Sequence, residues 1–311
     1  MNKFLLKGLI FFFICLGLSY VLDYMIQEGL KTSNYREITK WNEVTQGGIN
    51  AEILIVGSSR ALVHFDCEYI EKATGKSCYN LGFDGTTYPL QKLMLELYLS
   101  NNIKPKELIW SLDYHSFTSV PDYYGFEQLV PYRENSYVQK MLSMHETPNY
   151  QFQIPLFRYS YNPKMKVIGI YSYFGKYHRE PILIYGYRKQ NKKWDGNFDL
   201  FKKQNSKGHN VVFKEELFHD FTALNQQLLN QKISIEWVVA PYLEEYNKLL
   251  YNRSELLELL YDTAGQLKAP FYDYSSSEIS HSRNNFYNAT HLNQQGMDSW
   301  MGEFSENLIT N

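Results

Sequence analysis

From residue 51 onward, the apolar and polar positions follow two alternating periodicities. Short runs rich in β-branched and aromatic residues predict five strands, at 52–56, 77–81, 107–112, 233–240 and 269–274. Stretches with apolar residues at helical spacing predict helices at 61–73, 88–100, 214–230, 243–264 and 293–308. Strands that alternate with helices are typical of a parallel sheet, so the pattern predicts the α/β class.

The first residues carry a different pattern. Lys3 and Lys7 precede an uncharged apolar run over 8–22, and residues 4–6 lengthen it at the front. This length is close to the about 17–25 residues that cross a bilayer, and cations before the run favour a cytoplasmic N-terminus. We therefore expect a cytoplasmic tip and signal anchor over 1–23, with 4–22 in the membrane. The globular part of this single-pass protein is expected outside the cytoplasm.

Two further segments interrupt the alternation of strands and helices. Residues 24–50 are polar and mixed, and we expect them to form a membrane-proximal stalk. Residues from about 115 to 205 contain nearly half of the 27 tyrosines and only short apolar runs. We interpret them as one large Tyr-rich insertion in an α/β domain over 51–311. Its aromatic rings either stack on sugar faces or bury themselves within the insertion.

Composition narrows the class of protein. Apolar residues make up 44% of the chain and charged residues 21%, with a net charge of −2, so nucleic acid is not an expected partner. Cys15 lies in the expected anchor, while Cys67 and Cys78 either form a disulfide in an oxidising compartment or remain two buried thiols. The histidines show no metal-ligand spacing, and neither a metal nor a cofactor is expected.

The stretch GSSR ends the first predicted strand. A nucleophilic serine needs such an exposed position at a strand end, but Ser58 or Ser59 also suits the cap of the next helix. Ala61 occupies the second glycine position of a G-x-S-x-G elbow, so this is not an α/β-hydrolase motif. His291, just before the last helix, is the candidate base. We expect structural roles for the other histidines: His64, His115, His145, His178, His209, His219 and His281.

Three stretches together resemble the SGNH (GDSL-type) superfamily of hydrolases and acyltransferases. They are GSSR, NLGFDGTT at 80–87, and NATHLN at 288–293. The resemblance implies that Ser59 is the nucleophile and His291 the base, with Asn288 behind it. It also implies an oxyanion hole formed by the backbone N–H groups of Ser59 and Gly85. The fold it implies is a flavodoxin-like three-layer sandwich.

The chain is most similar to membrane-anchored extracytoplasmic members of that superfamily. These include the teichoic-acid D-alanylation protein DltD and the alginate O-acetylation proteins. This likeness implies acyl transfer or ester hydrolysis on a cell-surface glycan or its precursor. It further implies an acyl-carrying substrate and a multi-spanning membrane acyltransferase as partner.

Two positions depart from the superfamily pattern. The third strand ends in SLDYHSF without the usual Asn, so Asp113, Tyr114 or His115 is the candidate substitute, although an ionised Asp113 cannot donate a hydrogen bond. Asn288 stands where an Asp normally orients the histidine. An inactive SGNH-like domain that binds glycan or scaffolds an acylation complex is therefore the alternative. Arg60 either steadies an anionic group near the site or, as we expect, forms a surface salt bridge.

Overall fold

The structure is a computed structural model that describes residues 2–118, 125–145, 149–177 and 183–310. The chain divides into two compact units. Unit 1 comprises Met1–Gln46 and Pro121–Pro181, and unit 2 comprises Gly47–Val120 and Ile182–Asn311. The expected insertion over 115–205 is therefore divided between the units, because 121–181 groups with the N-terminal helices.

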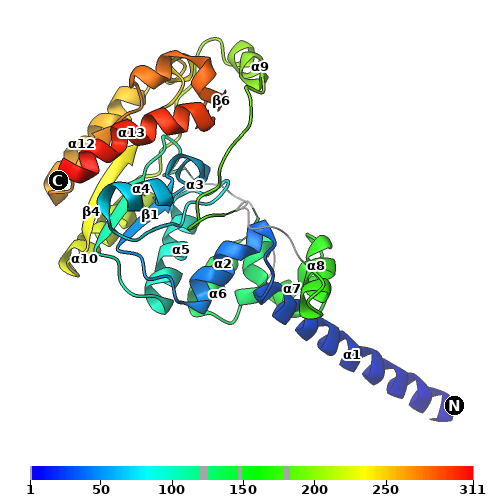
Figure 1. Cartoon of the computed structure of the whole chain (residues 1–311). Coiled ribbons are helices and arrows are strands. Elements are labelled where there is room, and N and C mark those ends of the chain that lie inside the picture. Colours follow the sequence, from blue (N-terminus) through cyan, green and yellow to red (C-terminus); the bar gives the residue numbers. More distant parts are fainter. Residues whose placement is uncertain (1, 119–124, 146–148, 178–182, 311) are drawn as a thin grey trace. The chain divides into compact units, whose positions relative to one another are not determined.

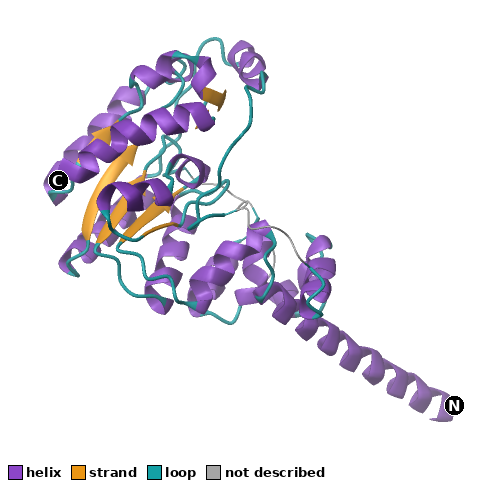
Figure 2. Cartoon of the chain, viewed as in Figure 1, coloured by secondary structure: helices purple, strands orange, loops and turns teal. Residues whose placement is uncertain are grey.

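Unit 2 contains a five-stranded sheet (Figure 2). Its strands all run parallel, in the order β2-β1-β3-β4-β5. They are β1 (Ile53–Gly57), β2 (Cys78–Asn80), β3 (Glu107–Ser111), β4 (Ser234–Val239) and β5 (Phe271–Asp273). The predicted α/β class with a central parallel sheet is confirmed, and each predicted strand overlaps one of the five.

The helices of unit 2 follow the strands along the chain (Figure 1). They are α3 (Ser59–His64), α4 (Cys67–Thr74), α5 (Tyr88–Asn101), α9 (Asn197–Gln204), α10 (Glu215–Asn230), α11 (Glu244–Asn247), α12 (Arg253–Leu267) and α13 (Gln294–Thr310). Before α13, the strands β6 (Phe286–Asn288) and β7 (His291–Leu292) form an antiparallel hairpin. Short 3-10 turns at Glu278–His281 and Arg283–Asn285 lead into it.

Two predicted helices are each divided in the structure. The helix expected over 61–73 is interrupted at Asp66, which caps α4 by accepting hydrogen bonds from two backbone N–H groups of its first turn. The helix expected over 243–264 is interrupted before Asn252, whose side-chain amide pairs with both backbone groups of Val211. In each case a polar side chain bonds the backbone and competes with a continuous helix.

Aromatic side chains on both faces of the sheet form the core of unit 2. Trp110 and Trp237 are register partners on β3 and β4, and Phe221 of α10 packs on both rings. Elsewhere Trp300 of α13 meets Phe65 edge to face at 4.7 Å. Every residue of β1 is buried, as expected for a parallel strand covered on both sides.

A disulfide links Cys67 to Cys78, with their Cα atoms 5.2 Å apart. Cys67 begins α4 and Cys78 begins β2, so the bond closes the segment between helix and strand. By the loop-entropy relation, a loop of this size stabilises the fold by about 3 kcal/mol. The sequence left open whether these two cysteines form a disulfide or remain separate thiols, and the structure contains the disulfide.

Unit 1 is helical. It contains α1 (Asn2–Lys31), α2 (Arg36–Gln46), α6 (Ser136–Ser143), α7 (Asn149–Gln153) and α8 (Lys164–Tyr173), with 3-10 turns at Phe126–Tyr132 and Phe157–Tyr159. Residues 24–46, expected to form a stalk, are thus largely helical. Within the described residues, one helix, Lys3–Lys31, is long and apolar enough to cross a membrane.

The last turns of α1 belong to the core of unit 1. Ile26 and Leu30 are buried, whereas the apolar side chains of the first part of the helix are exposed. Gly169 of α8 lies so close to α1 that a Cβ there would meet the backbone oxygen of Ile26 at 2.5 Å. The apolar segment thus continues as one helix into the core of unit 1.

Glu236 is an acidic residue in the centre of the sheet. It lies on β4, is 7% exposed, and has one buried carboxylate oxygen without a hydrogen-bond partner. Burial, assisted by the nearby carboxylate of Glu107, raises the pKa of Glu236 to about 7. The stability contributed by the protonated side chain is complete below the unfolded-state pKa of about 4.5 and is lost as the pH rises through 7.

We expect Glu236→Gln to remove this pH dependence, because the amide stays neutral. Relative to the wild type, the variant should gain roughly 2–3 kcal/mol of unfolding free energy between pH 5 and pH 8. Unfolding of the detergent-solubilised chain across this pH range measures the change. Glu258→Gln, on an exposed position of α12, is the matched control. An equal pH dependence in the wild type and Glu236→Gln would contradict the assignment.

Candidate active site

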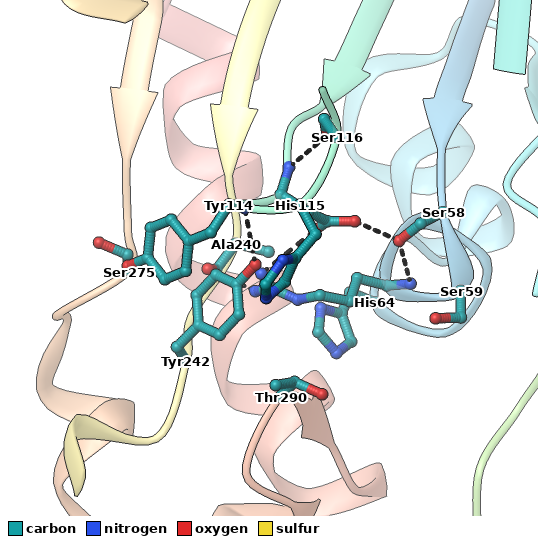
Figure 3. A network of polar contacts seen from close by, with 12 residues as sticks. Ser58, Ser59, His64, Tyr114, His115, Ser116, Ala240, Tyr242, Ser275 and Thr290 are labelled. Atoms are coloured by element: carbon teal, nitrogen blue, oxygen red, sulfur yellow. Dashed lines mark hydrogen bonds and ion pairs between the residues drawn. The ribbon is translucent and has the colours of Figure 1, made fainter. Parts of the chain in front are cut away.

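The turn after β1 gives its two serines different roles. Ser58 is the N-cap of α3, and its hydroxyl accepts a hydrogen bond from the backbone N–H of Arg60 at 3.1 Å. Ser59 begins α3, and its Oγ lies 2.8 Å from Nε2 of His291. Both serines lie where the chain leaves the strand and enters the helix (Figure 3). The sequence left open whether these serines cap the helix or include a nucleophile. In the structure Ser58 caps the helix, and Ser59 contacts the histidine.

Close packing positions this turn. A Cβ on Gly57, the last residue of β1, would lie 2.7 Å from both the backbone oxygen of Ser111 and the Cβ of Ala61. Only glycine therefore allows β3 and α3 to approach the end of β1 this closely. The first turn of α3, with Ser59 at its start, is consequently held against the sheet.

His291 is held by its neighbours in the β6–β7 hairpin. The next backbone N–H, that of Leu292, donates to Nε2 of the fully buried His64 at 2.9 Å. The ring of Tyr287 stacks on that of His291, with centroids 5.3 Å apart and an interplanar angle of 21°. The hairpin and α3 are therefore joined by a histidine–backbone hydrogen bond beside the Ser59–His291 pair.

Asn288 determines which nitrogen of His291 carries the proton. Its Oδ1 accepts hydrogen bonds from the backbone N–H groups of Thr290 and His291, at 3.1 and 2.9 Å, which identifies this atom as the carbonyl oxygen. The same oxygen lies 3.0 Å from Nδ1 of His291, so Nδ1 must be the protonated nitrogen. Nε2 then presents its lone pair to the hydroxyl of Ser59, as a general base requires.

His291 is neutral at physiological pH. Burial lowers its pKa to about 3, and the positive charge of Arg60 adds to the effect. Arg188 and Lys192 lower this pKa further, while the carboxylate of Asp84 opposes them. The ring is therefore available as a base, but it accepts a proton less readily than a histidine paired with a carboxylate.

The loop after β2 lies against the nucleophile turn. Asn80 donates to the backbone oxygen of Ala61 at 2.7 Å, and the N–H of Phe83 donates to the backbone oxygen of Gly57 at 3.3 Å. Gly85 adopts φ +66°, a left-handed conformation that suits glycine. The loop that carries this predicted oxyanion donor is thus attached to the residue before Ser58 and to α3.

Two of the residues at the end of β3 that could replace the missing Asn are bonded to other groups. Tyr114 donates its hydroxyl to Asn247 at 2.9 Å and accepts from Arg253 at 2.8 Å. His115 Nε2 pairs with the hydroxyl of Tyr246 at 3.0 Å. The hydroxyl of Tyr114 and Nε2 of His115 are therefore committed to partners other than Ser59 and His291.

Asp113, the third candidate, supports the turn instead. Its carboxylate accepts a hydrogen bond from the hydroxyl of Ser58 and forms an ion pair with Arg60 at 3.2 Å. The backbone N–H of Asp113 is held by Ser116 Oγ at 2.8 Å (Figure 3). A carboxylate in this position fixes the N-cap and the cation beside it.

The expectation of a surface role for Arg60 was wrong. Arg60 is 3% exposed, and its Nη2 donates to the backbone oxygens of Ala240 and Pro241 at 2.6 and 2.8 Å. Its guanidinium lies 3.3 Å from the ring centroid of Tyr242, a cation–π contact. The sequence shows this arginine next to the nucleophile, but its partners at the ends of β3 and β4 are far away in the chain.

Basic residues from the segment after 182 reach the same region. Arg188 forms a two-pronged ion pair with Asp84, with Nη2 and Oδ1 2.7 Å apart. Lys192 lies over the ring of Tyr287, the ring that stacks on His291, at 5.1 Å. Sequence reasoning assigned these residues to the insertion and missed them. The run RKQNKK at 188–193 was the available signal.

The remaining histidines have varied surroundings. His281 pairs with Glu244 at 2.8 Å near the surface, and His145 stacks on Phe126 with centroids 3.8 Å apart. His178 lies outside the described residues. In the part of the chain that the structure describes, no group of three or more His, Cys, Asp or Glu side chains is arranged to hold a metal ion.

Neither a protein-family model nor a curated protein sequence matches this chain. The assignment of a function therefore depends on the site geometry and on the resemblance of the three sequence blocks.

Proposed function

We propose that the chain is an SGNH-like serine acyltransferase or esterase that acts on a cell-surface glycan or its precursor. The observation that carries the proposal is the alignment of Ser59 Oγ, His291 and Asn288 Oδ1 at successive distances of 2.8 and 3.0 Å. A nucleophile, a base and a group that orients the base are the three parts that acyl transfer through serine requires.

The proposed reaction has two acyl-transfer steps. Ser59 Oγ attacks the acyl carbonyl carbon as Nε2 of His291 takes its proton, and the tetrahedral oxyanion forms between the N–H groups of Ser59 and Gly85. The C–O bond to the leaving group then breaks, and His291 returns the proton to that group. In the second step an acceptor hydroxyl, or water in an esterase, loses its proton to His291 and attacks the acyl carbonyl carbon. The bond between the acyl group and Ser59 Oγ then breaks, and His291 returns the proton to Oγ.

The strand order is consistent with this proposal. The order β2-β1-β3-β4-β5 is that of flavodoxin-like sheets, whose ligands bind beyond the carboxyl ends of the strands. Ser59 lies just beyond the carboxyl end of β1. We interpret the helices of unit 2 as the outer layers of a three-layer sandwich, and 121–181 as the Tyr-rich insertion.

The environment of the site favours an anionic substrate. Arg188 and Lys192 are close enough to depress the pKa of His291, and both belong to a strongly basic run. A substrate with phosphate or carboxylate groups would benefit from these charges. The glycan class and a multi-spanning acyltransferase partner are proposed from the resemblance alone.

A catalytically inactive SGNH-like domain is the second candidate. Two observations favour it: Asn288 cannot stabilise an imidazolium as a carboxylate does, and Tyr114 and His115 are bonded to other side chains. Such a domain would bind glycan or scaffold an acylation complex without turnover. The labelling experiment below separates the two candidates.

We expect a fluorophosphonate probe to label the full-length chain in detergent at Ser59. Ser59→Ala should abolish labelling because the nucleophile is gone, and His291→Ala should reduce it by at least about 100-fold because the base is gone. Ser58→Ala, which keeps Ser59, is the matched control and should still be labelled. Gel fluorescence and peptide mapping measure the result, with circular dichroism as the check on folding. An unlabelled wild type would favour the inactive domain.

We expect Asn288→Asp to strengthen the base. A carboxylate beside Nδ1 stabilises imidazolium, so it raises the pKa of His291 and moves the acidic limb of the labelling rate to higher pH. Labelling at pH 8 should become at least about tenfold faster, the reverse of the loss that Asp-to-Asn causes in serine proteases. Asn288→Ala, which leaves only the hydroxyl of Thr290, 2.9 Å from Nδ1, as an acceptor for Nδ1–H, should be slower than the wild type. Identical pH profiles for all three proteins would exclude a triad role for Asn288.

We expect Cys67 and Cys78 to be oxidised in intact cells, because unit 2 is proposed to lie outside the cytoplasm. A maleimide of large mass, added to denatured cell extract before and after reduction, counts the free thiols. Before reduction only Cys15 should react, and after reduction all three cysteines should. The double variant Cys67→Ala/Cys78→Ala provides the one-thiol reference. Three reactive thiols before reduction would place the unit in a reducing compartment.

A further inference from the structure

Within unit 1, residues 154–159 contact α1 where the apolar run of that helix ends. The backbone N–H of Leu156 donates to Asp23 Oδ1 at 2.7 Å, and Arg158 forms an ion pair with the same carboxylate at 3.4 Å. Both charged side chains are almost fully buried, at 7% and 4% exposure. Asp23 directly follows the uncharged run over 8–22. Residues 154–159 therefore lie at the level of α1 where its uncharged apolar run ends.

Helix α8 packs beside the next turn of α1 (Figure 1). Gly169 allows its backbone to approach Ile26, and Gly29 of α1 is in equally close contact with Gly169. Two glycines at the crossing let the helix backbones come together without side chains between them. Gly29 follows Asp23 by six residues, about 9 Å along the helix axis. Helix α8 is thus held within about one headgroup layer of the hydrocarbon boundary.

The outer face of α8 is apolar from Val167 onward, whereas Lys164, one turn earlier, is exposed and donates to the hydroxyl of Tyr35. Val167, Tyr171 and Phe174 are 57%, 52% and 58% exposed, and their spacing of four and three residues puts them on one side of the helix. Met165 and Ile168 are buried on the side toward the unit. A helix at the surface of a soluble domain normally carries polar residues on its outer face.

Further exposed apolar residues lie at the same level of α1. Ile154 and Phe157, next to the Asp23 ion pair, are 44% and 46% exposed. On α1 itself, Tyr20 and Tyr24 are 57% and 60% exposed. Tyrosines at this depth are typical of the aromatic belt at a membrane–water interface.

Basic residues flank the exposed stripe of α8. Lys166 lies in the first turn of the helix, and the exposed Lys176 follows its end. Long basic side chains beside an apolar face reach lipid phosphates while their methylenes stay in the apolar layer. Amphipathic helices that lie in the plane of a bilayer combine these two features.

We propose that unit 1 is a membrane-interface module in which α8 lies in the headgroup layer. Val167, Tyr171 and Phe174, together with Ile154 and Phe157, insert into the boundary between headgroups and acyl chains of the leaflet from which α1 emerges. The occupant is lipid, because Leu22 and Tyr24, on either side of the buried Asp23, are themselves exposed, so this surface adjoins the exposed apolar surface of α1. The proposal does not depend on the chemistry of Ser59.

Site-directed spin labelling of the full-length chain tests the insertion. In a Cys15→Ser background, which keeps the disulfide, nitroxides are attached at Tyr171→Cys and Phe174→Cys. Phe12→Cys on α1 is the reference inside the membrane. Lys140→Cys, on an exposed polar position of α6 in the same unit, is the matched aqueous control. The proteins are reconstituted into vesicles of phosphatidylcholine and phosphatidylglycerol, and collision rates with oxygen and with a water-soluble nickel complex are measured.

The expected result is a severalfold higher ratio of oxygen to nickel collisions at 171 and 174 than at 140, with the ratio at 12 higher still. Equal ratios at 171, 174 and 140 would show that the stripe lies in water and would overturn the proposal. Low collision rates with both reagents at 171 and 174 would also overturn it, since they would indicate that a protein covers the surface. Circular dichroism that matches the unlabelled chain is required of each variant.

Discussion

A buried guanidinium holds together the carboxyl ends of three neighbouring strands. Arg60, just after β1, pairs with Asp113 after β3 and donates to the backbone oxygens of Ala240 and Pro241 after β4. A charge removed from water in this way is stable only when it is paired and hydrogen-bonded, so the ends of these strands must keep their relative positions. Because Asp113 also accepts from the cap Ser58, the same network holds the turn that carries Ser59.

Asn288 stands where a carboxylate would stabilise a protonated histidine. It orients the ring of His291 but supplies no negative charge to stabilise imidazolium. Asn288 accepts from Nδ1 and from two backbone N–H groups, so the tautomer and ring orientation are defined. Arg60 and burial both disfavour a positive charge on the ring. An imidazolium at this position would therefore receive little stabilisation.

Helix α1 combines a segment that is long and apolar enough to cross a membrane with residues that belong to a folded core. Its exposed apolar side chains end near Leu22, and the next residue, Asp23, is buried against Arg158. An ion pair at this level is costly unless protein encloses it, and residues 154–159 provide that enclosure where the exposed apolar surface of α1 ends. The aromatic residues exposed nearby are suited to an interface that is apolar on one side and hydrated on the other.

The sequence alone determined the alternating strands and helices, the parallel sheet, the apolar N-terminal helix, and the choice of Ser59 and His291 as candidates. These follow from local periodicity, strand ends and short motifs. Only the tertiary structure decided that Ser58 is the cap, that Arg60 is buried, that Asp113 supports the turn, and that residues 121–181 group with α1. The cap bond from Arg60 to Ser58 is local, but the other three depend on contacts between segments that are 50 or more residues apart in the chain. Local patterns carry no information about such contacts, because packing against distant elements selects the position and the charge state of a side chain.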